Sequence, residues 1–223
     1  MATRQLLAEL AAAFERQSGC VVSFESVGGV DAVKRMQAGE VFDLVVLASE
    51  AIDKLIATGH IRAGSKLDLV LSGVAVAVRA GAALPDISSE GAVCLAVRAA
   101  RSISYSTGPS GVALVKLFER WGIADEIQSR LVQAPPGVPV ATLLASGQVE
   151  LGFQQLSELL HVKGVTVVGP LPPAIQITTT FSAGIPACAS ADSSRASQVR
   201  ALLDFMTSPL AAESKRRHGM EPA

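Results

Sequence analysis

The sequence predicts an α/β fold built as two lobes, each a mixed sheet flanked by helices. Three observations predict it. Apolar residues make up 49% of the chain and aromatic residues only 4%, which is typical of cores where small aliphatic side chains join helices to sheets. Strand-like and helix-like stretches alternate along the chain. The 223 residues are enough for two lobes of about 100 residues each.

The overall charge and the cysteines exclude several classes of protein. With 19 basic and 20 acidic residues the net charge is −1, so we expect no nucleic-acid partner. No apolar run reaches the roughly 18 residues of a membrane span, so we expect no membrane insertion. Cys20, Cys94 and Cys188 stand far apart without a nearby histidine, which predicts no metal and no cofactor. The chain begins without a signal peptide pattern, which as it stands predicts a cytoplasmic protein.

The first lobe opens on an amphipathic helix over Met1 to Ser18. Its apolar face contains Leu6, Leu7, Leu10, Ala13 and Phe14. Because no strand precedes this helix, we expect that an upstream strand is missing from the chain or was not included in it. The elements expected next are a strand at Cys20–Ser26, a glycine turn at 27–30 with a helix to Gly39, a strand at Phe42–Ala48, and a helix capped by Ser49 that runs to Ile56.

Two long β-prone runs predict the strands that link the lobes. One is Leu69–Arg79, interrupted by Ser72-Gly73, and the other is Ile175–Ala189. A two-lobed protein with a hinge needs two such crossings. We therefore expect lobe 1 to comprise residues 1–72 and 182–223, and lobe 2 to comprise residues 73–181.

The stretch that the second lobe is built around is Ser104-Tyr-Ser-Thr-Gly-Pro-Ser-Gly111. It joins a β-prone run to the helical pattern of 112–121, which makes it a strand-to-helix turn. Pro109 suits the first turn of a helix, and Gly111 would let a ligand approach the backbone. The unpaired N–H groups at this helix start favour an anion.

The rest of the second lobe continues the same alternation of strands, turns and helices. The expected elements are a helix from Glu90 to Ala100, a Pro135-Pro-Gly137 turn before a helix over 138–146, a strand at 150–154 that delivers Gln154, Gln155 and Ser157 to a loop, a helical turn at 158–161, and a strand at 165–168. Two helices, Ser194–Met206 and Pro209–His218, end the chain.

The order of these elements resembles a type II periplasmic solute-binding protein, and within that class the molybdate-binding family. The segments that carry the resemblance are Phe42–Glu50, Ser106–Gly111 with the helix that ends at Gly122, Leu151-Gly152, and Phe205–Ala212. The resemblance implies a two-lobed binding protein in the periplasm, a small anionic ligand held in the cleft between the lobes, and the permease of an ABC transporter as partner.

The same resemblance implies which residues bind the anion. In that family, hydroxyls and backbone N–H groups at helix N-termini hold an oxyanion without a counter-charge. The corresponding positions here are Thr3, Gly28, Gly29, Ser106, Thr107, Ser110, Gly111, Gly137 and Gln155. Glycines at 28 and 29 replace a serine pair, and Gln155 replaces a tyrosine. These changes favour a di- or tricarboxylate over molybdate, because a small tetrahedral ion needs a tight cage of donors.

A second hypothesis is an enzyme. The Gln154-Gln155 pair before Ser-Glu-Leu159 is similar to the branch of this fold that includes aconitate isomerase, which implies an isomerase that moves an allylic double bond. The acid–base candidates are Glu25, Tyr105 and Glu158, with His60 less favoured. A third hypothesis is a cytoplasmic sensor that uses this domain without a transporter. The first reading, a binding protein without catalysis, is the one we carry forward.

Overall fold

The computed structural model describes residues 2–160, 162–190 and 192–223. The chain divides into two compact units: unit 1 comprises Met1–Leu71 and Thr179–Ala223, and unit 2 is Ser72–Thr178. The sequence analysis places these boundaries at 72/73 and 181/182. The first boundary lies inside the strand β2 (Leu67–Arg79), so this strand begins in unit 1 and ends in unit 2.

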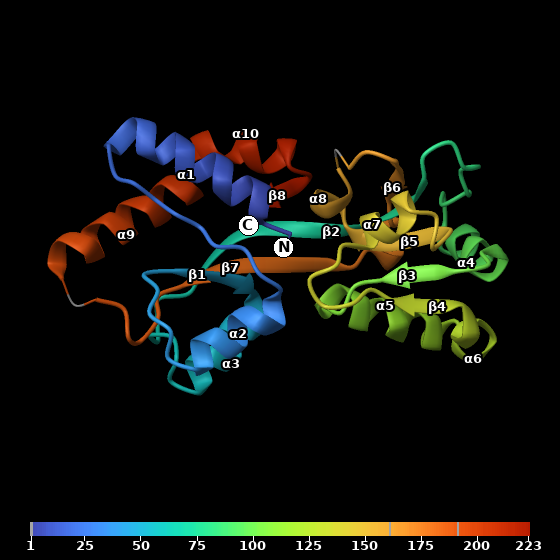
Figure 1. The fold of residues 1–223 in the computed structure, drawn as a ribbon, viewed down its shortest axis with the longest axis horizontal. Coiled ribbons are helices and arrows are strands. Elements are labelled where there is room, and N and C mark those ends of the chain that lie inside the picture. The colour runs from blue at the N-terminus through green and yellow to red at the C-terminus, as the bar shows by residue number, and fades with distance from the viewer. Residues whose placement is uncertain (1, 161, 191) are drawn as a thin grey trace. The chain divides into compact units, whose positions relative to one another are not determined.

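Unit 1 is a small sheet flanked by helices (Figure 1). Its strand β1 pairs antiparallel with β7, β7 pairs with β2, and β8 also pairs with β2. The elements are α1 (Arg4–Ser18), α2 (Gly29–Gln37), β1 (Val45–Ala48), α3 (Ser49–Ala57), the start of β2, β7 (Thr178–Gly184), α9 (Ser193–Thr207), α10 (Pro209–Arg217) and β8 (Met220–Pro222).

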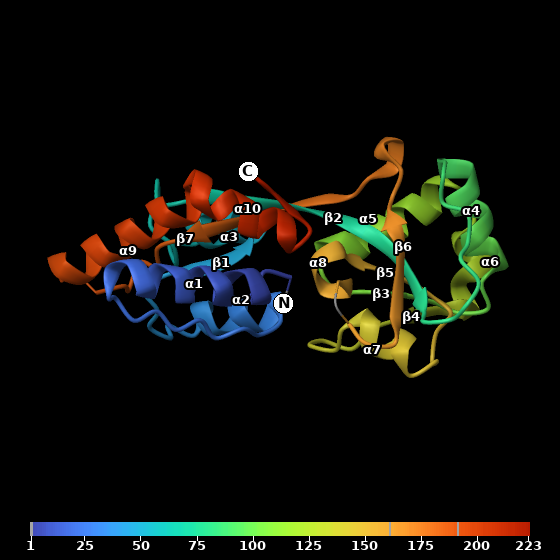
Figure 2. The same cartoon turned by 90° about the horizontal axis from the view of Figure 1, so that it is seen from above.

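The main core of unit 1 forms where α1 packs against α9 and α10 (Figure 2). The apolar face expected for the first helix is confirmed, since Leu6, Leu7, Leu10 and Phe14 are all buried. The ring of Phe14 lies 5.6 Å from that of Phe205 on α9. A second cluster, around α3 and β1, contains Met36, Leu47, Ile52, Leu55 and Ile61.

Unit 2 is a mixed sheet with helices on both faces. Strand β2 pairs antiparallel with β5 and β6, while β3 pairs parallel with β4 and β5. The elements are α4 (Glu90–Ala99), β3 (Ile103–Tyr105), α5 (Pro109–Arg120), α6 (Ala124–Ile127), β4 (Leu131–Gln133), α7 (Val140–Ala145), β5 (Leu151–Gln155), α8 (Leu156–Leu159) and β6 (Val165–Pro170), with short 3-10 helices at Gln128–Arg130 and Pro173–Ile175.

Each face of this sheet has its own core. Under α4 and α5, Phe118 packs edge-on against Phe153 with ring centroids 6.1 Å apart, beside Val97. Under α7, Ala75 and Ala77 of β2 meet Val140, Ala141 and Leu144. The α/β class and the mixed sheet flanked by helices are thereby confirmed.

The expected strand at Cys20–Ser26 is wrong. The segment belongs to no strand, and Val21 is 86% exposed. A strand needs a neighbour with which to exchange backbone hydrogen bonds, and this segment has none among the described residues. It is tied instead to α1, because the Val22 N–H donates to the Glu15 carboxylate at 2.6 Å.

The two long β-prone runs also differ in detail from the expectation. Strand β2 continues through Ser72-Gly73 without a break, and its register shifts at Val76/Ala77 against β6 instead. The second run yields only β7 as a strand. Beyond Gly184 the chain contains Pro186, which has no N–H to donate and keeps a single bridge to Ile61.

Most helix starts match the sequence, with small differences in capping. Ser89 caps α4 by accepting from the Ala92 N–H at 3.2 Å. Ser49 is the first residue of α3 and not its cap. The helical turn expected at 158–161 forms earlier, as α8, and its expected last residue lies outside the described residues. Within the described ranges, every helix is too short or too polar to cross a membrane.

Candidate functional site

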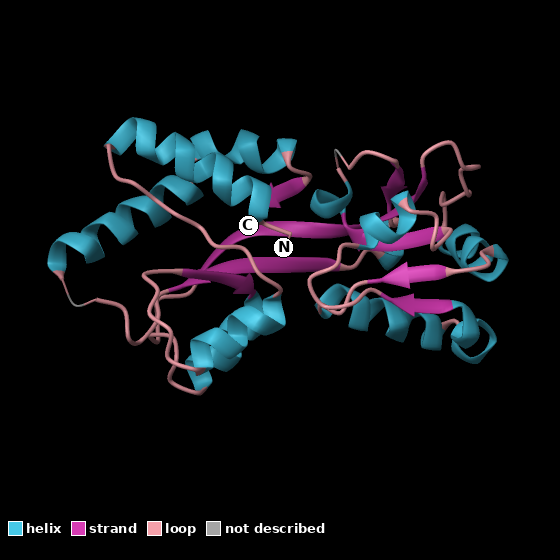
Figure 3. Cartoon of the chain, in the orientation of Figure 1, coloured by secondary structure: helices cyan, strands magenta, loops and turns pink. Residues whose placement is uncertain are grey.

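The turns that follow β3, β4 and β5 gather at one edge of the sheet in unit 2. These three strands are parallel, so their carboxyl ends meet at the same side, and Figure 3 draws the arrowheads of β3 and β4 toward it. In sheets of this kind ligands bind beyond the carboxyl ends of the strands. The turns are Ser106–Gly108, Ala134–Pro139 and the start of α8.

The turn after β3 leads into α5, and its hydroxyls come together as the sequence predicts for an anion site. Pro109 is the first residue of α5 and Gly108 its N-cap. The hydroxyl oxygens of Ser106 and Ser110 are 3.4 Å apart, which is long for a hydrogen bond, so each hydroxyl remains able to donate to a third group. The N–H of Ser110 also meets no acceptor among the described residues, so this turn offers three donors.

Gly111 has a different reason to be glycine from the one the sequence suggests. Its N–H donates to the Gly108 carbonyl at 3.0 Å, so this donor is already used. A Cβ added at Gly111 would lie 1.8 Å from the carbonyl oxygen of Ser106 and 3.1 Å from the Tyr105 ring. The missing side chain therefore makes room for the protein's own backbone and not for a ligand.

The turn after β4 is closed by its own backbone. The N–H of Val138 donates to the Pro135 carbonyl at 3.0 Å, and Gly137 has φ +78°, the conformation that the third residue of a type II turn requires. No acceptor for the Gly137 N–H occurs in the described parts of the chain, so this N–H stays available.

The side chain of Gln154, from β5, lies at the N-terminus of α7. This side chain is 3% exposed, and its Oε1 accepts from the Ala141 N–H at 3.4 Å. It also makes a side-chain hydrogen bond with Glu158. Gln154 therefore caps α7 and holds Glu158. The sequence analysis names Gln155 as the ligand donor, and Gln155 lies next in β5, 4% exposed and opposite Val74.

Two serines of the predicted turns, Ser104 and Ser157, have buried hydroxyls that the sequence does not single out as ligand donors. The Oγ atoms of Ser104 and Ser157 are covered and lack a hydrogen-bond partner among the described residues. Ser104 lies in β3 opposite Gly152, on the face that packs under α7, and Ser157 lies in α8 directly after β5. Serine in an otherwise apolar strand such as Ile-Ser-Tyr is the signal that could have identified Ser104.

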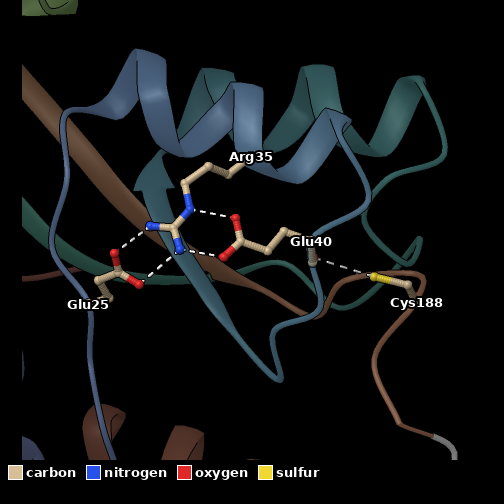
Figure 4. A network of polar contacts seen from close by, with 4 residues as sticks. All are labelled: Glu25, Arg35, Glu40 and Cys188. Atoms are coloured by element: carbon tan, nitrogen blue, oxygen red, sulfur yellow. Dashed lines mark hydrogen bonds and ion pairs between the residues drawn. The ribbon is translucent and has the colours of Figure 1, made fainter.

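Glu25 is not available as an acid or base. Arg35 donates to both of its carboxylate oxygens, at 2.7 and 2.8 Å, and also to Glu40 (Figure 4). The Arg35 guanidinium lowers the pKa of the Glu25 carboxyl, and the Glu25 side chain is 64% exposed. The network ties the loop before α2 to the loop after it, which is a structural role.

Among the other acid–base candidates, Glu158 stands out. It is half-buried, and this burial raises the pKa of its carboxyl, while the hydrogen bond from Gln154 acts in the opposite direction. Tyr105 packs its ring against the core beneath α5. His60 contacts the Thr58 hydroxyl at 2.9 Å through Nδ1, a local contact at the end of α3.

The remaining predicted residues lie in unit 1. Thr3 precedes α1 and is buried, and its carbonyl accepts from the Leu7 N–H at 2.8 Å. Gly28 is the N-cap of α2, and Gly29 is its first residue, with open space where a Cβ would be. Within the described residues, His, Cys, Asp and Glu nowhere gather in a group of three or more that could hold a metal ion.

The chain matches known proteins over nearly its full length. Residues 1–221 match the family model described as bacterial extracellular solute-binding protein. Aconitate isomerase of a Pseudomonas species is 34% identical over 220 residues, which is 96% of this chain and 82% of that protein.

Two solved structures show the same fold. The periplasmic molybdate-binding protein of Azotobacter vinelandii has a TM-score of 0.79 at 21% identity, covering 98% of this chain and 95% of that one. PEB3 of Campylobacter jejuni with bound L-phospholactate has a TM-score of 0.75 at 13% identity, covering 99% and 96%. The chain therefore belongs to the bacterial extracellular solute-binding proteins and has the type II periplasmic binding protein fold of their molybdate-binding-like members.

Proposed function

We propose that this protein binds a small oxyanion, a di- or tricarboxylate rather than molybdate, and delivers it to the permease of an ABC transporter. The proposed donors in unit 2 are the hydroxyls of Ser106, Thr107 and Ser110, the N–H groups of Ser110 and Gly137, and the amide of Gln155. The observation that carries the proposal is the pair of serine hydroxyls, 3.4 Å apart, at the N-terminus of a 12-residue helix. Hydroxyls and helix dipole there favour the same negatively charged group.

The choice of a carboxylate rests on the residue types at this edge. A glutamine amide can donate to a carboxylate and accept from a ligand hydroxyl, whereas the oxygens of molybdate only accept hydrogen bonds. In unit 1, the glycines at 28 and 29 offer no side-chain donor, and a Cβ added at Gly29 would meet nothing within 4 Å. The relative named aconitate isomerase and the neighbour with bound L-phospholactate both have names that refer to organic acids, which supports the same class.

Thermal shift distinguishes the two ligand classes. We expect citrate, cis-aconitate or trans-aconitate to raise the Tm, because saturating ligand at about 100 times its Kd adds about 2.7 kcal/mol of stability. Molybdate and tungstate should leave the Tm unchanged. Ser110→Ala should weaken the effect of the acid, while Ser88→Ala, at an exposed serine of the same unit, should not. A large shift with molybdate alone would contradict the proposed class.

A second candidate function is the isomerisation of an unsaturated tricarboxylate, and Glu158 is the observation that favours it. Moving an allylic double bond requires one group to take a proton from carbon and return a proton to the far end of the allylic system. A half-buried carboxyl with a raised pKa is suited to that exchange. Incubation with cis- or trans-aconitate, followed by ultraviolet absorbance, tests it. Turnover that disappears in Glu158→Gln, with acid binding retained, would establish the enzyme over the binding protein.

A further inference from the structure

Lys215 is a buried cation in the last turn of α10 in unit 1. The residue is 3% exposed. Its Nζ forms no ion pair and no hydrogen bond among the described residues. Unlike Ser104 Oγ and Ser157 Oγ, which are wholly covered, the Nζ atom is not wholly covered. The carbon chain is therefore covered while the ammonium keeps some contact with the outside.

The acidic groups around Lys215 are already engaged by other cations. Figures 1 and 2 show α10 beside α1 and β8. On α1, the Glu9 carboxylate accepts from Ser214 at 2.7 Å, from Arg217 at 2.5 Å and from His218 at 2.7 Å. On β8, Glu221 pairs with Arg216, and on α10 itself Glu213 pairs with Arg217.

An unpaired buried ammonium is costly, and no carboxylate in the part of the chain that the structure describes pairs with Lys215 to offset that cost. Burial lowers the pKa of Lys215, with no nearby carboxylate acting against it. The next residues, Arg216 and Arg217, are each paired with carboxylates, so Lys215 is the cation of this turn that has no such partner among the described residues. A partly dehydrated cation is a strong attractor for a small anion, because a charge-assisted bond to it is not weakened by full hydration.

We propose that Lys215 is an anion-binding site of unit 1 that takes one carboxylate group of a small organic acid. The ammonium donates charge-assisted hydrogen bonds to that carboxylate. The site uses α10 and its neighbours in unit 1, and it stands independently of the serine pair on α5.

The lysine 13Cε signals of protein labelled with 13C-lysine report on this site directly, without modifying the ammonium. The Lys215 signal is assigned by its loss in Lys215→Met, and that of the exposed Lys34 by its loss in Lys34→Met. Acetate and citrate are then titrated against sodium chloride at equal ionic strength. We expect the Lys215 signal to shift saturably with the carboxylates and the Lys34 signal to follow ionic strength only.

Two variants separate this site from the one on α5. In Ser110→Ala the Lys215 signal should still respond to acetate. In Lys215→Met, acetate should lose about tenfold or more of its stabilising affinity relative to Lys34→Met, as for a lost hydrogen bond to a charged group. A Lys215 signal that tracks ionic strength alone, in protein that citrate still stabilises through Ser110, would overturn the Lys215 site and leave the proposed function standing.

Discussion

At the scale of single residues, Gly111 shows how a glycine in a candidate site can serve the fold. The Ser106 carbonyl occupies the space of its side chain, at 1.8 Å from an ideal Cβ. We therefore expect Gly111→Ala to destabilise the protein by about 3 kcal/mol, at the upper end of overpacking effects, with or without ligand. Gly91→Ala on α4 is the matched control, since its Cβ would meet nothing within 4 Å. It should stabilise by about 0.5 to 1 kcal/mol. Urea unfolding of both variants checks the pair.

Glu9 links α1 to α10 and makes stability depend on pH. Its hydrogen bond from Ser214, followed by those from Arg217 and His218, lowers its pKa to about 2. A carboxyl whose pKa is depressed in the folded state contributes stability above its unfolded pKa and loses it as pH falls through the folded value.

We therefore expect Glu9→Gln to destabilise the protein at pH 7 and to flatten the decline in stability between about pH 4.5 and pH 2. Since the Glu9 side chain is 36% exposed, solvent screening reduces the effect to about 1 kcal/mol. Urea midpoints across that pH range give the measurement. Equal slopes for the variant and the parent protein would show that the ion-pair network adds nothing.

At the scale of elements, most helices were predictable, whereas several strands were not. Besides the segment at Cys20–Ser26 and the shortened β7, the short strands β4 and β8 were not predicted, and neither was the short helix α6. Apolar spacing and capping residues are local, so α1, α4 and α5 follow from the sequence within a few residues. A strand depends on partners elsewhere in the chain. Cys20–Ser26 has β-prone residues but no partner among the described residues, and β7 stops short because Pro186 cannot continue a ladder.

The candidate site likewise has a part that the sequence predicts and a part that it does not. The α5 turn was predictable, because hydroxyls, proline and glycine between a strand and a helix have a local meaning. Which of two adjacent glutamines caps α7 was not, because successive side chains of a strand point to opposite faces and the register decides. The unpartnered hydroxyls of Ser104 and Ser157 likewise depend on what packs over them.

Gln154 connects β5 to α7 and α8 through the hydrogen bonds of its side chain. Gln154→Leu leaves the Ala141 N–H buried without an acceptor. Because the bond that is lost is long, at 3.4 Å, we expect a loss of about 1 kcal/mol, the lower end for such a change. The pKa of Glu158 should rise further, because the hydrogen bond that lowers it is removed. Chemical denaturation and a carboxyl NMR titration measure the two effects. Gln148→Leu, at an exposed glutamine just after α7, serves as the control and should change neither.

At the scale of the whole molecule, the two units differ in how the chain builds them. Unit 2 is one continuous segment, and its sheet is covered on both faces by clusters drawn from that segment. Unit 1 is assembled from two segments. Its α1 packs on α9 and α10, and its β1 pairs with β7, so each segment supplies the partner that the other lacks.

This difference predicts how fragments behave. We expect the isolated segment Ser72–Thr178 to fold and to unfold cooperatively, because both of its cores are internal to it. The segment 1–71 alone should remain unfolded, since the apolar face of α1 then has no helix to cover it and β1 has no neighbouring strand. Mixing it with segment 179–223 should restore part of the helical signal.

Circular dichroism and the dispersion of amide signals in NMR spectra measure folding in both cases. A molten Ser72–Thr178 fragment would mean that β2 needs its first residues, Leu67–Leu71, before the sheet of unit 2 can form.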